Sequence, residues 1–161
     1  MASTITDVDL RHLRRAISVS VSARANGNHP FGAVLADATG QVVAEAENTV
    51  ETGRDVTGHA ETNLVRIASA QWTPELLASH TLYTSCEPCT MCTGAIFWSG
   101  ITRIVFALSV EGLMQFFDTR PDAPLHQMAS SRLLTPEDGI EVLGPALESE
   151  AAKAHKGFWT T

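Results

Sequence analysis

The chain has 161 residues, of which 44% are apolar, and a formal net charge of −7. This length predicts a single domain over residues 1–161 with one buried core, and no apolar run approaches the ~20 residues that a transmembrane helix requires. The acidic balance, eleven Lys and Arg against eighteen Asp and Glu, disfavours a nucleic-acid partner. Three cysteines and no signal-peptide pattern favour a metal or redox role in the cytoplasm.

The first expected element is a helix over residues 7–25, where apolar residues recur at helical spacing. Thr6 and Asp9 are expected to form its N-terminal capping box, and Gly27 to end it. The only basic cluster of the chain lies on this helix and consists of Arg11, Arg14 and Arg15. We interpret the cluster as the solvated side of an amphipathic helix, the alternative being a contact with nucleic acid.

A hairpin of two strands, residues 31–36 and 41–46, is expected next, with turn chemistry at residues 37–40. A polar loop (48–57) and a second helix (59–70) follow. The remaining expected elements are a strand at 81–85, a helix from Pro88 to near Gly100, a strand at 101–108, a short helix at 111–117, a strand at 140–143 and a helix at 148–158. This alternation predicts an α/β protein, a three-layer α/β/α sandwich around a mixed five-stranded sheet.

Two short segments about thirty residues apart carry the chemistry, His59-Ala60-Glu61 and Pro88-Cys89-Thr90-Met91-Cys92. The combined pattern, H-x-E followed by P-C-x-x-C, is typical of zinc-dependent nucleobase deaminases. His59, Cys89 and Cys92 supply three ligands for Zn²⁺, which leaves a fourth position for a reactive water. Glu61 is predicted to be the catalytic residue that moves protons.

Either half of this pattern alone has other interpretations. A lone C-x-x-C also occurs in structural zinc sites and thioredoxin-like motifs. Cys86, three residues before Cys89, is a candidate fourth ligand that would close the site. We expect Cys86 instead to be a small buried residue.

Over residues 11–108 the chain resembles the cytidine-deaminase-like superfamily. The segments at 29–34, 55–61 and 81–98 are most similar to bacterial guanine deaminases. tRNA adenosine deaminases share much of the pattern, but they usually have Leu where Cys86 stands and a positively charged surface. The resemblance implies hydrolytic deamination of a free nucleobase, with guanine as the leading substrate, and a homodimer.

The resemblance also implies roles for individual residues. Phe31 would pack on the base, Asn48 would hydrogen-bond the ring, Ala60 would offer its backbone N–H, and Trp98 would wall the pocket. Asp118 would assist catalysis at the amino group, and the segment between Phe106 and Asp118 is a few residues shorter than in the family. Two aromatic residues near the C-terminus resemble a segment that covers the neighbouring subunit's pocket, and these are Phe158 and Trp159.

Structural interpretations of the same residues stay open. Phe31 and Trp98 are also compatible with a plain core, Asn48 with a turn, and Asp118 with an ordinary loop. Four histidines without a spacing signal are interpreted as ordinary polar residues: His29, His80, His126 and His155. Other functions also stay open: deamination of adenosine in tRNA, of cytosine, a nucleoside or an s-triazine, and a non-catalytic zinc scaffold.

Overall fold

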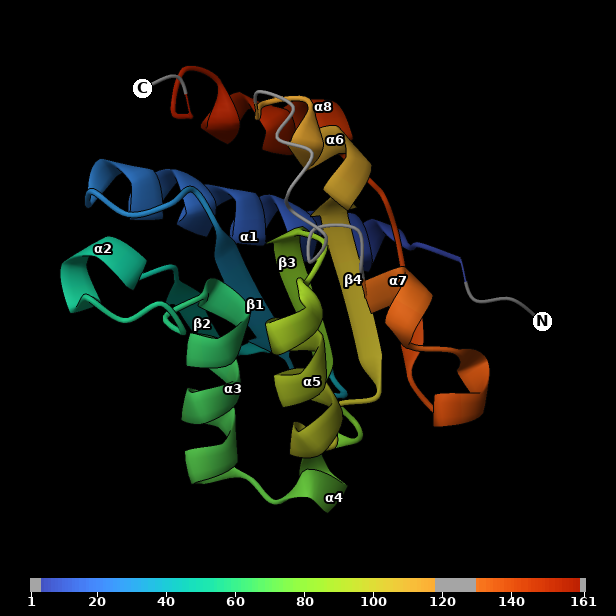
Figure 1. Ribbon diagram of the computed structural model, residues 1–161. Helices are drawn as coiled ribbons and strands as arrows, with labels where there is room; N and C mark the ends of the chain where they lie inside the picture. Colours follow the sequence, from blue (N-terminus) through green and yellow to red (C-terminus); the bar gives the residue numbers. More distant parts are fainter. Residues whose placement is uncertain (1–3, 118–129, 160–161) are drawn as a thin grey trace.

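The computed structural model describes residues 4–117 and 130–159 (Figure 1). Asp118 and His126 lie outside the described residues. The α-helices are α1 (Asp7–Ala25), α2 (Val50–Gly53), α3 (Ala60–Gln71), α4 (Pro74–Leu77), α5 (Thr90–Ser99), α6 (Val110–Met114), α7 (Ser130–Leu133) and α8 (Glu148–Ala151). The strands are β1 (Gly32–Ala36), β2 (Val42–Glu47), β3 (Thr81–Cys86), β4 (Arg103–Leu108) and β5 (Glu141–Leu143), and two 3₁₀ helices are η2 (Pro136–Asp138) and η3 (Ala152–His155).

The strands form one mixed sheet in the order β2-β1-β3-β4-β5. β1 runs antiparallel to both β2 and β3, whereas β3, β4 and β5 are parallel. The predicted hairpin is confirmed, since β1 and β2 pair through a turn in which the Asp37 side chain accepts from the Thr39 and Gln41 N–H groups. The predicted mixed five-stranded sheet is therefore correct.

Helices cover both faces of the sheet and bury a separate core on each (Figure 1). Alternate residues of a strand point to opposite faces. On β1, Val34 packs with α1, and its neighbour Leu35 packs with α3 and α5. Likewise Val105 of β4 belongs to the first core and Ile104 to the second. This confirms the three-layer α/β/α sandwich.

The close contact between α1 and the sheet depends on Gly32. A Cβ atom there would lie 2.5 Å from both the Ala16 carbonyl oxygen and the Ser20 nitrogen. The predicted capping box at the start of α1 is present, because Thr6 accepts from the Asp9 N–H and Asp9 accepts from the Thr6 N–H. The sequence thus fixes where α1 begins and how closely it can approach β1.

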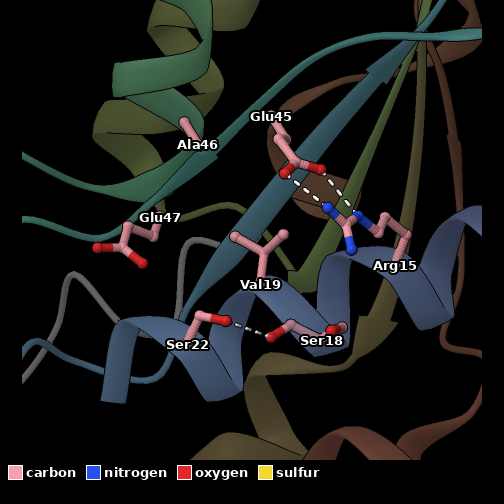
Figure 2. Close-up of a pocket in the computed structure, with 7 residues that line it drawn as sticks. All are labelled: Arg15, Ser18, Val19, Ser22, Glu45, Ala46 and Glu47. Atoms are coloured by element: carbon pink, nitrogen blue, oxygen red, sulfur yellow. Dashed lines mark hydrogen bonds and ion pairs between the residues drawn. The ribbon is translucent and has the colours of Figure 1, made fainter. Parts of the chain in front are cut away.

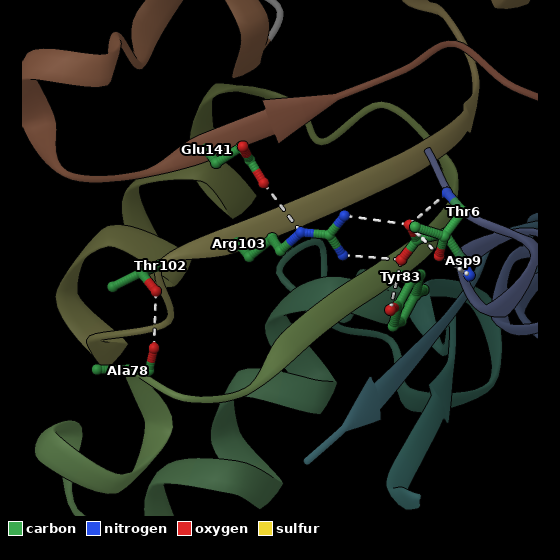
Figure 3. Close-up of polar contacts among 7 residues, drawn as sticks. All are labelled: Thr6, Asp9, Ala78, Tyr83, Thr102, Arg103 and Glu141. Carbon is green, nitrogen blue, oxygen red and sulfur yellow. Dashed lines mark hydrogen bonds and ion pairs between the residues drawn. The ribbon is translucent and has the colours of Figure 1, made fainter. Parts of the chain in front are cut away.

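The buried side chain of Asp9 continues from this cap into a polar network (Figure 3). Arg103 donates two hydrogen bonds to it, at 2.8 and 3.1 Å, and the Tyr83 hydroxyl donates a third at 2.8 Å. Arg103 also pairs with Glu141 at 2.9 Å. The network joins α1 to three neighbouring strands, β3, β4 and β5.

Several predicted boundaries were wrong. The expected loop at 48–57 contains the helix α2, because the Asn48 side chain accepts from the Val50 N–H and starts a turn. Pro88 lies outside α5, which begins after its N-cap Cys89. The expected closing helix at 148–158 is α only as far as Ala151 and continues as η3.

Within residues 4–117 and 130–159, no helix combines the length and the apolar composition needed to cross a membrane.

Candidate metal centre

The three predicted zinc ligands come together at the starts of two helices. His59 is the N-cap of α3, Cys89 is the N-cap of α5, and Cys92 lies one turn into α5. An N-cap side chain ordinarily bonds to the first turn of its own helix. Neither His59 nor Cys89 does so. Both side chains are therefore available to a metal, and their ligand atoms lie with that of Cys92 within 4.8 Å of one another.

The separations of these atoms match a tetrahedral zinc site. His59 Nδ1 is 3.6 Å from Cys89 Sγ and 3.5 Å from Cys92 Sγ. Zinc bonds of about 2.3 Å to sulfur and 2.0–2.1 Å to nitrogen, at a tetrahedral angle, place the two ligand atoms about 3.6 Å apart. The donor set therefore fits Zn²⁺. Among the described residues, no further His, Cys, Asp or Glu completes the group.

The two thiols of the group differ in acidity. The hydrogen bond from Cys92, together with His59, lowers the pKa of Cys89 to about 4 despite burial. The same contact with Cys89, together with burial, raises the pKa of Cys92 well above its usual range. The hydrogen bond to Cys89 also raises the pKa of His59. As the pH rises, Cys89 is thus the first of the two thiols to lose its proton. The thiolate is the form in which cysteine binds a metal.

Glu61 lies on the first turn of α3 and is 4% exposed. Its Oε1 accepts a hydrogen bond of 2.6 Å from Thr84 of β3, and its Oε2 lies 3.5 Å from Cys92 Sγ. Burial raises the pKa of this carboxyl, and the Thr84 hydrogen bond offsets that effect only in part. A carboxyl beside a metal group, outside its ligand set and with a raised pKa, is suited to proton transfer.

Asn48 lies close to this group. The Thr49 N–H donates to the Gly58 carbonyl at 2.8 Å, which brings the end of β2 beside His59. Asn48 is 1% exposed, and its Oδ1 accepts from the Val50 N–H. Its buried Nδ2 has no partner among the described residues. An unpaired buried donor costs about 1–3 kcal/mol, so this N–H₂ suits an acceptor on a ligand.

The structure places the other predicted pocket residues as follows. Ala60, fully buried, is the first residue of α3, so its N–H has no acceptor within the helix. Phe31 is partly buried between the two cores, and its carbonyl accepts from the Asn48 N–H. Trp98 is 82% exposed near the end of α5. The roles assigned to all three residues stay predictions.

Cys86 is not part of the metal group. It is a free cysteine, 2% exposed at the end of β3, and it packs in the core beneath α1. Burial raises the pKa of its thiol well above the usual range, which disfavours the thiolate. These surroundings agree with the interpretation of Cys86 as a small buried residue.

The interpretation of His155 as an ordinary polar residue was wrong. It is 1% exposed, and burial lowers its pKa to about 4. Trp159 stacks on it and donates Nε1–H to its Nδ1 at 3.2 Å, while Phe31 packs on it at 5.2 Å between ring centroids. The C-terminal aromatic segment therefore packs against Phe31 of its own chain.

This fold and this ligand group place the protein in the class of zinc-dependent deaminases. The family model for the cytidine and deoxycytidylate deaminase zinc-binding region matches residues 6–108, well over half of the chain. The chain belongs to this family.

Individual relatives differ in substrate. A probable cytosine deaminase of Schizosaccharomyces pombe is 46% identical over 161 residues, covering 99% of this chain and 98% of its own. A guanine deaminase of Bacillus subtilis is 41% identical over 98 residues, 59% of this chain and 61% of its own. Among solved structures, a guanine deaminase from Nitrosomonas europaea superposes with a TM-score of 0.75 at 24% identity, covering 100% of this chain and 87% of its own. That likeness shows the fold alone.

Proposed function

We propose that this chain is a hydrolytic deaminase of a free nucleobase, built as one domain. The observation that carries the proposal is the buried Glu61, held by Thr84 beside a ligand group with zinc spacing. A structural zinc site has no use for such a carboxylate. Bound zinc would supply an activated water as the nucleophile.

The residues around the ligand group have separate roles in proton transfer and in binding of the base. Glu61 takes a proton from the attacking water on Oε2 and delivers it to the ring nitrogen next to the attacked carbon. It then moves the hydroxyl proton of the tetrahedral adduct to the amino nitrogen, which leaves as ammonia as the carbonyl forms. Thr84 holds Oε1 and so fixes the direction of Oε2. Asn48 Nδ2 and the Ala60 N–H donate to acceptors on the base, and Phe31 packs on its face. Asp118 and Trp98 stay predicted contributors.

Two bases are the candidates. Similarity to the guanine deaminase of B. subtilis covers 59% of the chain. Similarity to the probable cytosine deaminase of S. pombe covers 99%, so it includes residues 109–134, from which we expect several substrate contacts. This full-length similarity favours cytosine, with uracil as product, and leaves guanine, with xanthine as product, as the second candidate.

Deamination of adenosine in tRNA has support from a tRNA-specific adenosine deaminase of Haemophilus influenzae, 37% identical over 73% of this chain and 71% of its own. Two arginines of the basic cluster on α1 are paired with glutamates. Arg14 pairs with Glu150 at 3.1 Å, and Arg15 pairs with Glu45 at 2.7 Å (Figure 2). Together with the net charge of −7, this pairing opposes approach of a polyanion.

A homodimer is proposed through the outer side of α5. Met91, Phe97 and Trp98 of this helix are 37%, 43% and 82% exposed. A helix that is apolar all round is normally covered. A second copy of the chain would cover these side chains, and Trp98→Glu is expected to shift the mass in light scattering from dimer to monomer.

The three free thiols suit the reducing cytoplasm.

A substrate panel tests the proposed function. Zinc-loaded protein is incubated with cytosine, guanine, adenine, cytidine, an amino-s-triazine and a tRNA anticodon stem-loop, and ammonia is measured. We expect release from cytosine first, and loss of that activity after chelation of the metal with recovery on adding Zn²⁺. Release from the stem-loop alone would establish the tRNA alternative. No release from any compound would leave the scaffold alternative.

A further inference from the structure

Glu87 is a buried carboxylate that the proposed reaction does not use. It lies between the end of β3 and the metal ligand Cys89, and it is 5% exposed. Its Oε1 accepts from the Ser131 N–H at 3.0 Å, the Ser131 hydroxyl at 2.6 Å and the Ser130 hydroxyl at 3.4 Å. Its Oε2 accepts from the Val110 N–H at 3.2 Å. The two oxygens therefore bind different segments of the chain.

These contacts join parts of the chain that are far apart in sequence. Val110 is the first residue of α6, 23 positions after Glu87, and Ser130 and Ser131 begin α7, more than forty positions after it. The backbone of Glu87 adds a further link. Its N–H donates a 2.8 Å hydrogen bond to the carbonyl of Leu108, the last residue of β4. One residue thus connects the loop before Cys89 to β4, α6 and α7.

The hydrogen bonds around Glu87 come from neutral groups. Buried acidic side chains are rare unless a partner compensates their charge. Here four neutral donors do so, and hydrogen bonds to a charged acceptor are stronger than those between neutral groups. The donors reach the carboxylate only when the starts of α6 and α7 stand at their present distance from the metal loop. The buried charge therefore favours this one arrangement over others.

We propose that Glu87 is a positioning residue of the deaminase site, which holds the Cys89 loop in register with α6 and α7. The inference rests on the proposed function. It assigns to Glu87 an effect on the placement of a metal ligand and on substrate binding, without contact to either. Small displacements remote from the reacting atoms cost large factors in rate, about 100-fold for 1 Å.

The chain offers a matched control for this role. Glu111 of α6 and Arg132 of α7 form a second link between the same two helices, on the surface, with side chains 60% and 58% exposed. Exposed ion pairs contribute about 0–1 kcal/mol. Glu111→Gln breaks a link between α6 and α7 without touching the metal loop, whereas Glu87→Ala releases both helices from that loop.

The experiment compares Glu87→Ala, Glu87→Gln and Glu111→Gln as zinc-loaded full-length proteins, each well below its own unfolding temperature. For Glu87→Ala we expect kcat/KM to fall about 100-fold, mainly through KM, and zinc loss to a chelator to accelerate about 10-fold. Glu87→Gln keeps one acceptor oxygen, so its losses should be intermediate. Glu111→Gln should stay within about twofold of wild type in both measurements.

A Glu87→Ala protein with a lowered unfolding temperature but wild-type KM and zinc loss would overturn the proposal, because a merely structural role predicts that result. If Glu87→Ala does not fold, Glu87→Gln and Ser131→Ala, which removes the 2.6 Å bond, carry the same comparison. If the wild type deaminates no base, the proposed function fails. The chelator measurement then still decides whether Glu87 positions Cys89.

Discussion

Asp9 of α1 and Glu61 of α3 are buried carboxylates on opposite faces of the sheet, and their surroundings differ. Burial raises the pKa of Asp9, but hydrogen bonds from Arg103, Thr6 and Tyr83 outweigh it and hold that pKa well below the usual range. Burial also raises the pKa of Glu61, and the Thr84 hydroxyl, a backbone hydrogen bond of Glu61 and His59 oppose this effect without reversing it. A buried carboxylate that is paired with an arginine stabilises the fold, whereas one beside a metal group whose pKa stays raised is suited to proton transfer.

Adjacent residues of β3 serve the two carboxylates. The Tyr83 hydroxyl donates to Asp9 at 2.8 Å, and the Thr84 hydroxyl donates to Glu61 at 2.6 Å. Successive side chains of a strand point to opposite faces of the sheet. The same strand thus supports a structural network on one side and the candidate site on the other.

The largest effect is expected at Glu61. Glu61→Gln keeps the shape of the side chain and removes its proton-transfer capacity, so kcat/KM for the base should fall about 10³-fold. Zinc content should stay that of wild type, and the free energy of unfolding should be unchanged or higher, because a neutral amide is easier to bury than a carboxylate. Ammonia release, metal analysis and urea unfolding give the three quantities. A loss of stability as large as that of an Asp9 variant would contradict the contrast.

Asp9→Asn should show the opposite profile. Removing the charge leaves Arg103 without its main partner, which should lower the free energy of unfolding by about 3 kcal/mol. Activity per folded molecule should be unchanged. Glu141→Gln is the matched control, since it removes the other, more exposed partner of Arg103 and should cost less than about 1 kcal/mol. Urea unfolding and initial rates separate the effects, and equal costs for both variants would refute the assignment.

The pH dependence of stability should follow Asp9. Its folded pKa lies below the unfolded value of about 3.9, so its carboxylate contributes stability above that pH, and the contribution is lost as the pH falls further. Between about pH 5 and pH 3, the wild type should lose about 1 kcal/mol more than Asp9→Asn. Urea unfolding at a series of pH values measures this difference. Parallel curves for the two proteins would show that Asp9 is not the group responsible.

Local signals in the sequence were sufficient to predict the metal-ligand group. The H-x-E and P-C-x-x-C segments identify the ligand group because both helix starts are coded within a few residues. The capping box of Thr6 and Asp9 and the hairpin of β1 and β2 were likewise predicted. Each of these features depends on neighbours within a turn of helix or a few positions along a strand.

Other contacts, around Asp9, Glu87 and His155, join residues that are far apart in the sequence, so no local pattern predicts them. Asp9 meets Arg103 across 94 positions, and Glu87 meets Ser131 across 44. The burial of His155 depends on docking of the C-terminal segment against Phe31. The nearly continuous apolar sequence of α5 likewise gave no sign that Trp98 would be exposed. Only the assembled sheet brings such residues together or leaves them uncovered.

The test with the smallest expected effect removes, one at a time, the hydroxyl groups of two adjacent residues of β3. Tyr83→Phe removes a hydrogen bond to a charged acceptor and should cost about 1.5 kcal/mol of stability with no change in kcat. Thr84→Val keeps the shape of a fully buried side chain but frees Glu61 Oε1, so kcat should fall about 10-fold as the proton carrier loses its fixed direction. Both variants are measured by urea unfolding and by ammonia release.

Because the residues are neighbours, a general disturbance of β3 would affect stability and kcat alike in both variants. Only a division of labour across the sheet makes Tyr83→Phe act on stability alone and Thr84→Val lower kcat.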